Sequence, residues 1–272
     1  MQLLNVCRVS LSALLTTLLV TTAAFAQTPA PAKPSTTPFE PRVGQPGKDV
    51  VWVPTPQALV DRMLDIAKVT PNDFVMDLGS GDGRTVITAA KRGATAMGVE
   101  FNPDMVELSK RAAQKEGVAG KATFVQGDLF KADLSKATVI TMFLLPSINM
   151  QLRPSLLNLK PGTRIVSNTF TMEDWQADQT ESVTDDCSSW CTALLWIVPA
   201  KVQGTWKTPQ GNLTLTQEFQ MLTGSLNGTA ISGGKMNGDQ ISFTAGGTTY
   251  NGRVNGAGNT ISGGNLTANK LN

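Results

Sequence analysis

Apolar residues along residues 51–200 fall into short runs separated by longer amphipathic segments. Residues 73–78, 95–101 and 138–145 form short, mostly apolar runs, which are typical of buried strands. Residues 85–91 and 103–115 lie between such runs and fit helices, the second with Asn102 as its expected N-cap, and a further helix is expected over about residues 149–159. Because strands alternate with helices at this spacing, the pattern predicts parallel strands joined by right-handed crossovers, in a sheet buried on both faces.

The pattern changes after residue 200. From residue 201 the chain is rich in Gly, Asn, Thr and Ser, and an Asn-Gly pair recurs at residues 227–228, 237–238 and 255–256. Asn-Gly favours the type I′ turn of a tight β-hairpin, because both positions need positive φ. Residues 201–272 are therefore predicted to form a small antiparallel β-meander domain or half-barrel, which serves either as a structural cap or as a module that binds carbohydrate or protein.

The first 50 residues are predicted to precede the folded part. Arg8, an apolar run at residues 11–20, and the small residues at 24 and 26 predict a signal peptide over residues 1–26, cleaved after Ala26. The run is short for a membrane span, so no stable span is expected after cleavage, and the protein is expected to be exported, periplasmic or secreted. Residues 27–50 are rich in Pro and Thr and are predicted to be a disordered linker.

Charge and composition exclude several classes of function. The formal charge of +2 falls to +1 without residues 1–26, which gives no electrostatic case for nucleic acid. The chain has no histidine, which excludes His-based triads and most zinc sites, so no metal is expected. Cys187 and Cys191 are an even pair in a predicted exported protein and indicate a disulfide, with a metal or redox pair as the alternative.

A glycine-rich turn follows the first predicted strand. Gly79, Gly81 and Gly83 read G-x-G-x-G rather than the G-x-G-x-x-G of dinucleotide-binding turns, and Asp77 precedes them. A carboxylate at that position repels a pyrophosphate but suits an ammonium group, such as that of S-adenosylmethionine (SAM). Glu100, about 20 residues downstream, is placed to accept ribose hydroxyls, and Asp128 to meet an adenine edge. The alternative is a Rossmann-like turn that binds NAD or nothing.

These motifs resemble the class I SAM-dependent methyltransferases. Residues 53–56 (VPTP), 77–84 (DLGSGDGR), 98–103 (GVEFNP) and 127–130 (GDLF) are most similar to the small lysine methyltransferases related to the mitochondrial enzymes that modify the ADP/ATP carrier and the ATP synthase. The resemblance implies a Rossmann-like, seven-stranded, mostly parallel methyltransferase sheet over residues 51–200. It also implies that SAM is held by Pro54, Thr55, Asp77, Gly79, Ser80, Gly81, Asp82, Glu100, Asn102, Asp128 and Leu129. From spacing alone, VPTP is equally explained as the entry to a helix capped by Thr55.

The loop after the fourth strand is expected to face the transferred methyl group. Residues 144–147 read Leu-Leu-Pro-Ser, whereas DNA and glutamine methyltransferases carry an Asn-Pro-Pro-Tyr-type motif there, so the sequence argues against an amide or nucleobase acceptor. Phe143, Pro146 and Trp175 are predicted to shape an apolar slot for the amine of a lysine in a protein substrate.

The predicted cofactor and the predicted export conflict, because SAM is made in the cytoplasm while the N-terminus predicts export. Besides a working methyltransferase, the sequence allows an exported nucleoside-binding protein without activity, or an envelope interaction protein that acts through residues 201–272. The sequence does not indicate an oligomeric state.

Overall fold

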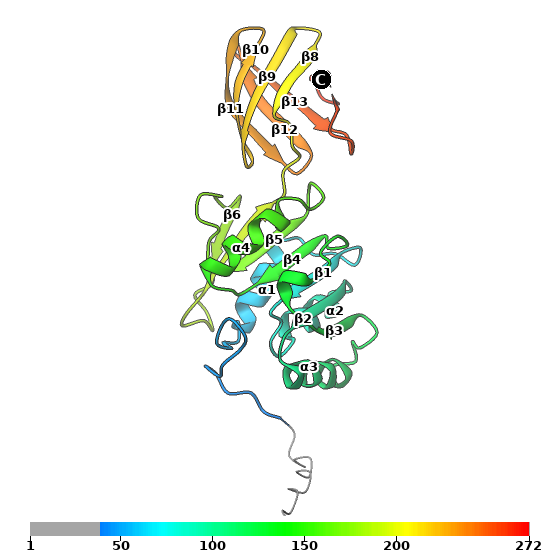
Figure 1. The fold of residues 1–272 in the computed structure, drawn as a ribbon, viewed down its shortest axis with the longest axis vertical. Coiled ribbons are helices and arrows are strands. Elements are labelled where there is room, and N and C mark those ends of the chain that lie inside the picture. Colours follow the sequence, from blue (N-terminus) through cyan, green and yellow to red (C-terminus); the bar gives the residue numbers. More distant parts are fainter. Residues whose placement is uncertain (1–38, 272) are drawn as a thin grey trace, which may run out of the picture. The chain divides into compact units, whose positions relative to one another are not determined.

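The computed structural model describes residues 39–271, so the predicted signal peptide and residues 27–38 of the predicted linker lie outside the described residues. The first domain is built on a seven-stranded sheet with the order β3-β2-β1-β4-β5-β7-β6 (Figure 1). Its strands are β1 (Phe74–Leu78), β2 (Thr95–Glu100), β3 (Ala122–Gln126), β4 (Val139–Met142), β5 (Arg164–Asn168), β6 (Gln179–Ser182) and β7 (Thr192–Ile197). Strands β1 to β5 pair in parallel, and β7 runs antiparallel to both β5 and β6. The predicted mostly parallel seven-stranded sheet is confirmed.

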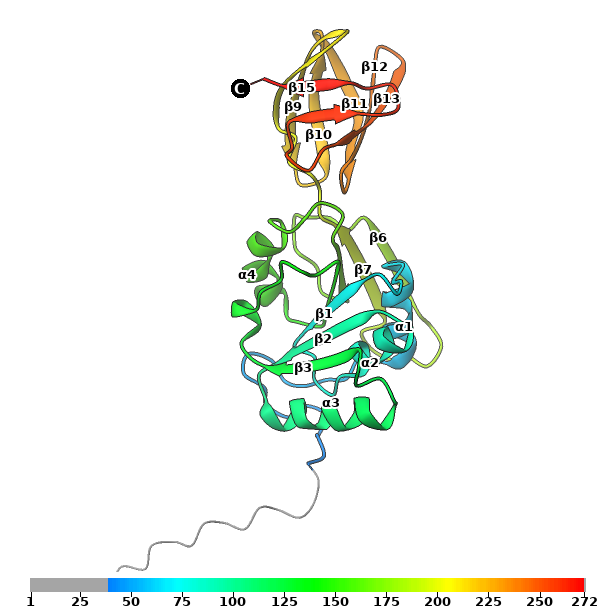
Figure 2. The same cartoon turned by 90° about the vertical axis from the view of Figure 1, so that its right-hand side faces the viewer.

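Helices cover both faces of this sheet (Figure 2). They are α1 (Gln57–Ile66), α2 (Arg84–Lys91), α3 (Pro103–Lys115) and α4 (Pro146–Leu156), with a short 3-10 helix, η1 (Leu129–Lys131). Successive residues of β1 face opposite sides: Val75 packs in the core that α1 and α2 cover, and Met76 packs in the core that α4 covers. The near-continuous apolar runs of the sequence are therefore explained by burial on both sides.

Two helix starts differ from the prediction. Helix α1 begins after Pro56 without a side-chain cap, whereas the sequence predicts Thr55 as its N-cap. Helix α4 begins at Pro146, earlier than the predicted start at residue 149, because proline lacks only an N–H that the first turn leaves unpaired. The predicted cap of α3 is confirmed, since the Asn102 side chain accepts a hydrogen bond from the Asp104 N–H at 2.9 Å.

Residues 45–54 form a segment that we call the strap, and it corrects part of the predicted linker. Backbone hydrogen bonds join Gly44 N to Trp52 O at 2.8 Å and Trp52 N to Gln45 O at 2.9 Å. Pro46 and Val51 form an isolated antiparallel bridge between them. Residues 42–50 are therefore not a disordered spacer, because backbone hydrogen bonds join residues 42–52 to one another and the strap contacts the first domain through Gln45 and Lys48.

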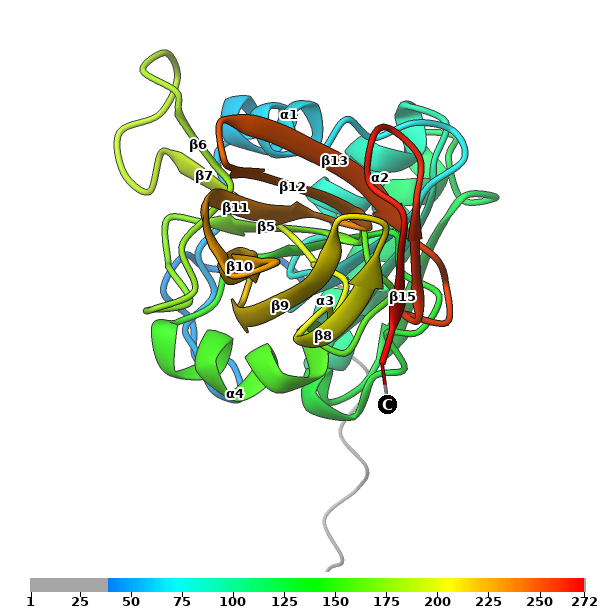
Figure 3. The same ribbon diagram turned by 90° about the horizontal axis from the view of Figure 1, so that it is seen from above.

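The second domain is a closed antiparallel barrel (Figure 3). Its strands are β8 (Gly204–Thr208), β9 (Gly211–Glu218), β10 (Met221–Leu226), β11 (Thr229–Asn237), β12 (Gln240–Ala245), β13 (Thr248–Val254), β14 (Thr260–Ser262) and β15 (Ala268–Lys270). Asn227 and Gly228 both have positive φ, as the predicted type I′ turn requires, and this turn is confirmed. The same prediction is wrong for the other two Asn-Gly pairs, because only Gly238 has positive φ at residues 237–238 and neither residue does at 255–256. The meander closes because β15 pairs with β8, so the half-barrel is a complete barrel, with Trp206 and Phe243 in its apolar core.

Polar and aromatic side chains join the barrel to the first domain. Trp175 is fully buried, stacks on Phe219 at a centroid distance of 5.8 Å, and donates from Nε1 to Gln220 Oε1 at 3.0 Å. Gln220 Nε2 in turn donates to the Gln176 carbonyl at 2.8 Å. Lys235 on β11 pairs with Asp178 at 3.0 Å. Gln220 thus pairs with the buried Trp175 N–H and with the partly buried Gln176 carbonyl of the first domain at once.

Replacing Gln220 with Ala is expected to lower the free energy of unfolding by about 1 to 2 kcal/mol, because the buried Trp175 N–H and Gln176 carbonyl lose their partner. Urea denaturation followed by tryptophan fluorescence measures this loss. Gln210→Ala is the matched control, since Gln210 is an exposed glutamine on the same domain. Equal stability of the two variants would contradict the assigned role of Gln220.

Candidate active site

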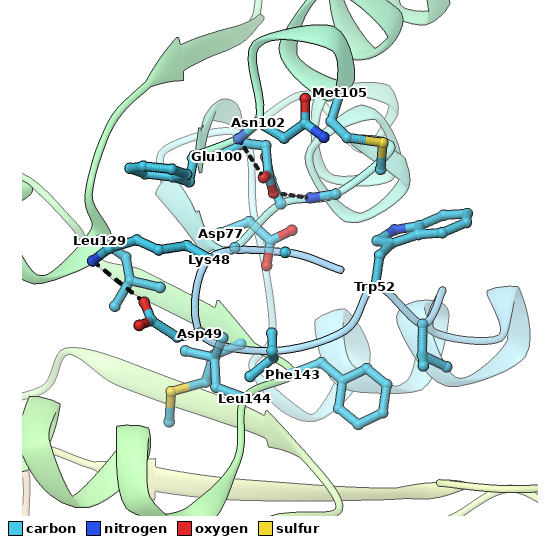
Figure 4. A pocket seen from close by; sticks show the side chains of 18 of the residues that line it. Lys48, Asp49, Trp52, Asp77, Glu100, Asn102, Met105, Leu129, Phe143 and Leu144 are labelled. Carbon is cyan, nitrogen blue, oxygen red and sulfur yellow. Dashed lines mark hydrogen bonds and ion pairs between the residues drawn. The ribbon is translucent and has the colours of Figure 1, made fainter. Parts of the chain in front are cut away.

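One pocket opens at the carboxyl ends of β1, β2 and β4, the end where ligands bind in open α/β sheets. It is covered on one side by the strap. All eleven residues predicted to hold the cofactor line it: Pro54, Thr55, Asp77, Gly79, Ser80, Gly81, Asp82, Glu100, Asn102, Asp128 and Leu129. Figure 4 shows Asp77 from β1, Glu100 from the end of β2 and Leu129 from the start of η1 around the pocket.

The glycine turn is fastened to the neighbouring strand. The N–H groups of Gly79 and Ser80 donate to the Val99 carbonyl at 2.9 and 3.1 Å. Gly81 has φ of +55°, and a Cβ at this position would lie 2.5 Å from Trp52 Nε1 on the strap. The turn therefore needs glycine at residue 81 both for its backbone conformation and for the close approach of the indole. Ser80 Oγ is buried against β2, close to Gly98, without a hydrogen-bond partner among the described residues.

Glu100 holds its carboxylate at the end of β2. Oε2 accepts from the Gly81 N–H and Oε1 accepts from the Asn102 N–H, both at 2.9 Å. These bonds, drawn in Figure 4, fix the carboxylate between the glycine turn and the start of α3. A carboxylate oriented in this way retains free lone pairs for hydroxyl groups of a ligand.

Asp77 is a carboxyl group in an unusual environment. It is only 6% exposed, and it accepts a hydrogen bond from the Thr141 hydroxyl at 2.7 Å. Burial, reinforced by the nearby charges of Asp82 and Glu100, raises the pKa of Asp77 to about 7. A cationic ligand group beside Asp77 would favour the ionised form and lower this pKa again. The site is therefore suited to an ammonium group.

Asp128 marks the other end of the pocket. It accepts hydrogen bonds from Lys48 Nζ on the strap and from the Phe130 N–H, each at 3.0 Å. The hydrogen bond from Lys48, followed by that from Phe130, holds the pKa of Asp128 below its usual value. The Lys48 ammonium also lies over the rings of Phe101 and Phe130, at 5.5 and 5.7 Å from their centroids.

Aromatic side chains line the end of the pocket beyond β4 and β5. Phe143, as predicted, lies here, and it packs against Phe170 and Trp190, each with a centroid distance of 5.9 Å. Two other predicted residues of the slot do not line the pocket: Pro146 starts α4, and Trp175 is buried under the barrel. The predicted role of Trp175 as a wall of the slot does not fit where the structure places it, because its indole is used in the contact with Gln220.

Sequence reasoning misses several residues that line the pocket, among them Lys48, Trp52, Phe170 and Trp190. A signal for Trp190 is present in the sequence, since it lies between Cys187 and Cys191, which the structure joins by a disulfide. Lys48 and Trp52 both precede the VPTP motif, but the Pro-rich composition of this segment alone gives no reason to place them on the pocket.

Comparisons with known proteins agree with this geometry. The family described as ANTKMT methyltransferase domain matches residues 77–179. A protein-lysine N-methyltransferase of Saccharolobus islandicus is 48% identical over 139 residues, which cover 50% of this chain and 86% of that protein. The adenine nucleotide translocase lysine N-methyltransferase of Mus musculus is 36% identical over 43% of this chain and 52% of that protein, so the chain spans about half of that relative.

A solved structure also resembles the first domain. It is described as an RNA methyltransferase from Salinibacter ruber in complex with S-adenosyl-L-homocysteine, with 47% identity and a TM-score of 0.52, and the match covers 55% of this chain and 96% of that one. The matched share of this chain corresponds to the length of the first domain, so the match does not extend to the length of the barrel.

Proposed function

This chain belongs to the SAM-dependent methyltransferases of the ANTKMT methyltransferase domain family, and we propose that it methylates the side-chain amine of a lysine in a protein substrate. The observation that carries this proposal is an apolar, aromatic slot that opens from the cofactor pocket at the end of β4. The relatives named for lysine methylation support the same acceptor.

The residues of the pocket fit SAM. The carboxylate of Asp77 suits the ammonium of its amino-acid part. The fixed carboxylate of Glu100 suits the ribose hydroxyls, and Asp128 suits an exocyclic amine of the base. SAM supplies a methyl group activated on a sulfonium, which an amine accepts by in-line displacement.

The slot must present the amine with a free lone pair. At pH 7, deprotonating a lysine with an ordinary pKa of 10.4 costs about 4.6 kcal/mol. Phe143, Phe170 and Trp190 surround the slot with apolar surface, which disfavours the charged form and lowers this cost. With no histidine in the chain, we propose that solvent at the open side of the slot takes the proton.

A nucleic-acid acceptor is the second candidate, because the Salinibacter structure is described as an RNA methyltransferase. The residues after β4 argue against it here. Phe143, Leu144 and Leu145 provide no polar clamp for the planar amino group of a base. The low formal charge of +2 gives little attraction to phosphates.

The test compares the two acceptors directly. The protein is incubated with SAM labelled in its methyl group and with a peptide library carrying one central lysine, a matched library with central glutamine, or total RNA. We expect label only in the lysine library, with mass spectrometry placing the methyl group on the lysine Nε. Label in RNA alone would overturn the proposal, and so would equal labelling of the lysine and glutamine libraries.

SAM binding is expected to strengthen as the pH rises from 5 to 7 and then to level off. Because the pKa of Asp77 is about 7 without a cation, Asp77 must release a proton when an ammonium binds below that pH. Calorimetric titration at pH 6 in two buffers of different ionisation enthalpy should therefore detect proton release, which disappears at pH 8. A pH-independent affinity over this range would contradict the assignment of Asp77.

We also propose that the protein works in an oxidising compartment, as an exported protein would. The disulfide between Cys187 and Cys191 supports this proposal, because such bonds persist mainly outside the reducing cytosol. Cell fractionation with sequencing of the mature N-terminus tests it, and a start at Gln27 is the expected result. Protein found only in the cytoplasm with Met1 intact would contradict it.

Among residues 39–271, no helix is long and apolar enough to span a membrane.

A further inference from the structure

We propose that Trp190 is the outer wall of the acceptor slot and that the Cys187–Cys191 disulfide holds it in place, so that acceptor binding depends on an intact disulfide. This inference rests on the proposed lysine acceptor. It assigns a specificity-determining residue to the loop between β6 and β7, a part of the chain outside the cofactor motifs.

The slot has three aromatic walls, each from a different connection. Phe143 follows β4, Phe170 follows β5, and Trp190 comes from the β6–β7 hairpin. The rings of Phe143 and Phe170 are stacked at 19°, whereas Trp190 is tilted by 58° against Phe143. Two walls therefore lie directly beyond the carboxyl ends of β4 and β5, and the third lies on the loop of residues 183–191.

Trp190 is the outermost of these walls. Its side chain is 43% exposed although it lines the pocket, so one part of the indole faces solvent and another contacts Phe143. Leu145, also 43% exposed, lines the same pocket. An acceptor side chain that enters from solvent meets Trp190 before it reaches the buried end of the slot.

The backbone at Trp190 needs support to stay in this position. Trp190 has φ of +55°, the left-handed region that bulky residues rarely adopt. Such a conformation persists only where the surrounding structure imposes it. Here Trp190 directly precedes Cys191, inside the small ring that the disulfide closes, and the Val183 N–H donates to the Cys191 carbonyl at 2.9 Å at the base of the loop.

The chemistry of the walls fits a lysine side chain. Its hydrocarbon stem packs on apolar surface, and after methylation its ammonium is attracted to the faces of aromatic rings. An indole is the strongest of the common rings in this respect. Removing or displacing Trp190 should therefore weaken acceptor binding and leave the cofactor residues, which lie on other parts of the chain, unaffected.

The test measures methyl transfer to the lysine-centred peptide library and, separately, SAM affinity by calorimetry. Trp190→Ala is expected to raise KM for the library roughly tenfold with little change in kcat, and Trp190→Phe to restore most of the loss. Cys187→Ser/Cys191→Ser is expected to raise KM by a similar factor. The dissociation constant of SAM should stay within about twofold in all variants, since only the acceptor wall changes.

Reduction provides the matched control. Dithiothreitol supplies the two electrons and two protons that convert the disulfide into two thiols, and it is itself oxidised to a cyclic disulfide. Reduction should raise KM of the wild-type protein but should not raise KM of Trp190→Ala further, because reduction and the substitution both act on the Trp190 wall. Acrylamide quenching of tryptophan fluorescence should increase on reduction in the wild type and not in Trp190→Phe.

The outcomes separate this inference from the proposed function. A wild-type protein that binds SAM but methylates no lysine peptide overturns the lysine acceptor, and the role of Trp190 falls with it. A wild-type protein that methylates the library while Trp190→Ala and the serine variant match its KM overturns only the role of Trp190 and its disulfide. A raised KM in Trp190→Ala, together with an unchanged KM of the wild type after reduction, overturns only the role of the disulfide.

Discussion

Replacing Asp77 with Asn is expected to weaken SAM binding at pH 8 by at least about a hundredfold and, in the same variant, to stabilise the protein without cofactor. Both effects follow from one buried carboxyl group. In the complex, an ionised Asp77 would pair with the ammonium of SAM, and breaking such a buried pair is costly. Without the cofactor, that same charge is buried, and the neighbouring charges of Asp82 and Glu100 disfavour it further.

The pH dependence of stability explains why Asp77→Asn should stabilise the protein without cofactor. Because the pKa of Asp77 is raised from 3.8 to about 7 on folding, the folded state resists ionisation, and stability is lost as the pH rises from about 4 to 7. Above pH 7 the loss is complete. The neutral amide of Asp77→Asn does not ionise and so does not lose this stability. The variant should therefore be more stable than the wild type by about 1 to 3 kcal/mol at pH 8, and the two proteins should be nearly equally stable at pH 4.

Thermal unfolding at both pH values and calorimetric titration of SAM measure these two changes. Asp104→Asn is the control, because Asp104 is an exposed acidic residue in the first turn of α3. The control should bind SAM as the wild type does and show no gain in stability at pH 8. A variant at Asp77 that lost stability and affinity together would indicate a general structural defect instead.

The sequence is sufficient to predict the cofactor-binding residues of the site, because each of them lies next to a strand that the sequence identifies. Asp77, the glycine turn and Glu100 each lie at the end of a strand whose apolar pattern is clear, and parallel strands bring their carboxyl ends to one edge of the sheet. The order of the elements therefore determines which side chains meet. Asp128 follows by the same reasoning from β3.

The acceptor half is harder to predict because distant segments build it. Strand β6 reads Gln-Thr-Glu-Ser and lies at the sheet edge, so it lacks the apolar pattern that identifies the other strands. Because β6 is not predicted from the sequence, the position of the loop that carries Trp190 cannot be predicted either. The sequence points to Trp175 instead, since nothing local distinguishes an indole at a pocket from one under a second domain.

Replacing Gly98 with Ala is expected to lower the free energy of unfolding by about 2 to 3 kcal/mol and SAM affinity by at least about tenfold. Gly98 lies in the middle of β2, where glycine has no favourable propensity of its own. A Cβ there would lie 2.4 Å from Ser80 Oγ, 2.7 Å from Ser80 Cβ and 2.8 Å from a ring carbon of Phe124. The glycine is needed for the close approach of the turn to the strand.

Neither neighbour can yield without disturbing the site. Phe124 is buried in the core that α2 and α3 cover, and Ser80 is held to β2 by the hydrogen bond from its N–H to the Val99 carbonyl. An added methyl group must therefore push the glycine turn off the strand, which also displaces the Gly81 N–H from the Glu100 carboxylate. Gly120→Ala is the matched control, because a Cβ at Gly120 meets nothing within 4 Å. Urea denaturation and calorimetry of both variants test the prediction, and a Gly98→Ala protein that matched the control in stability and SAM affinity would show that the turn does not depend on this contact.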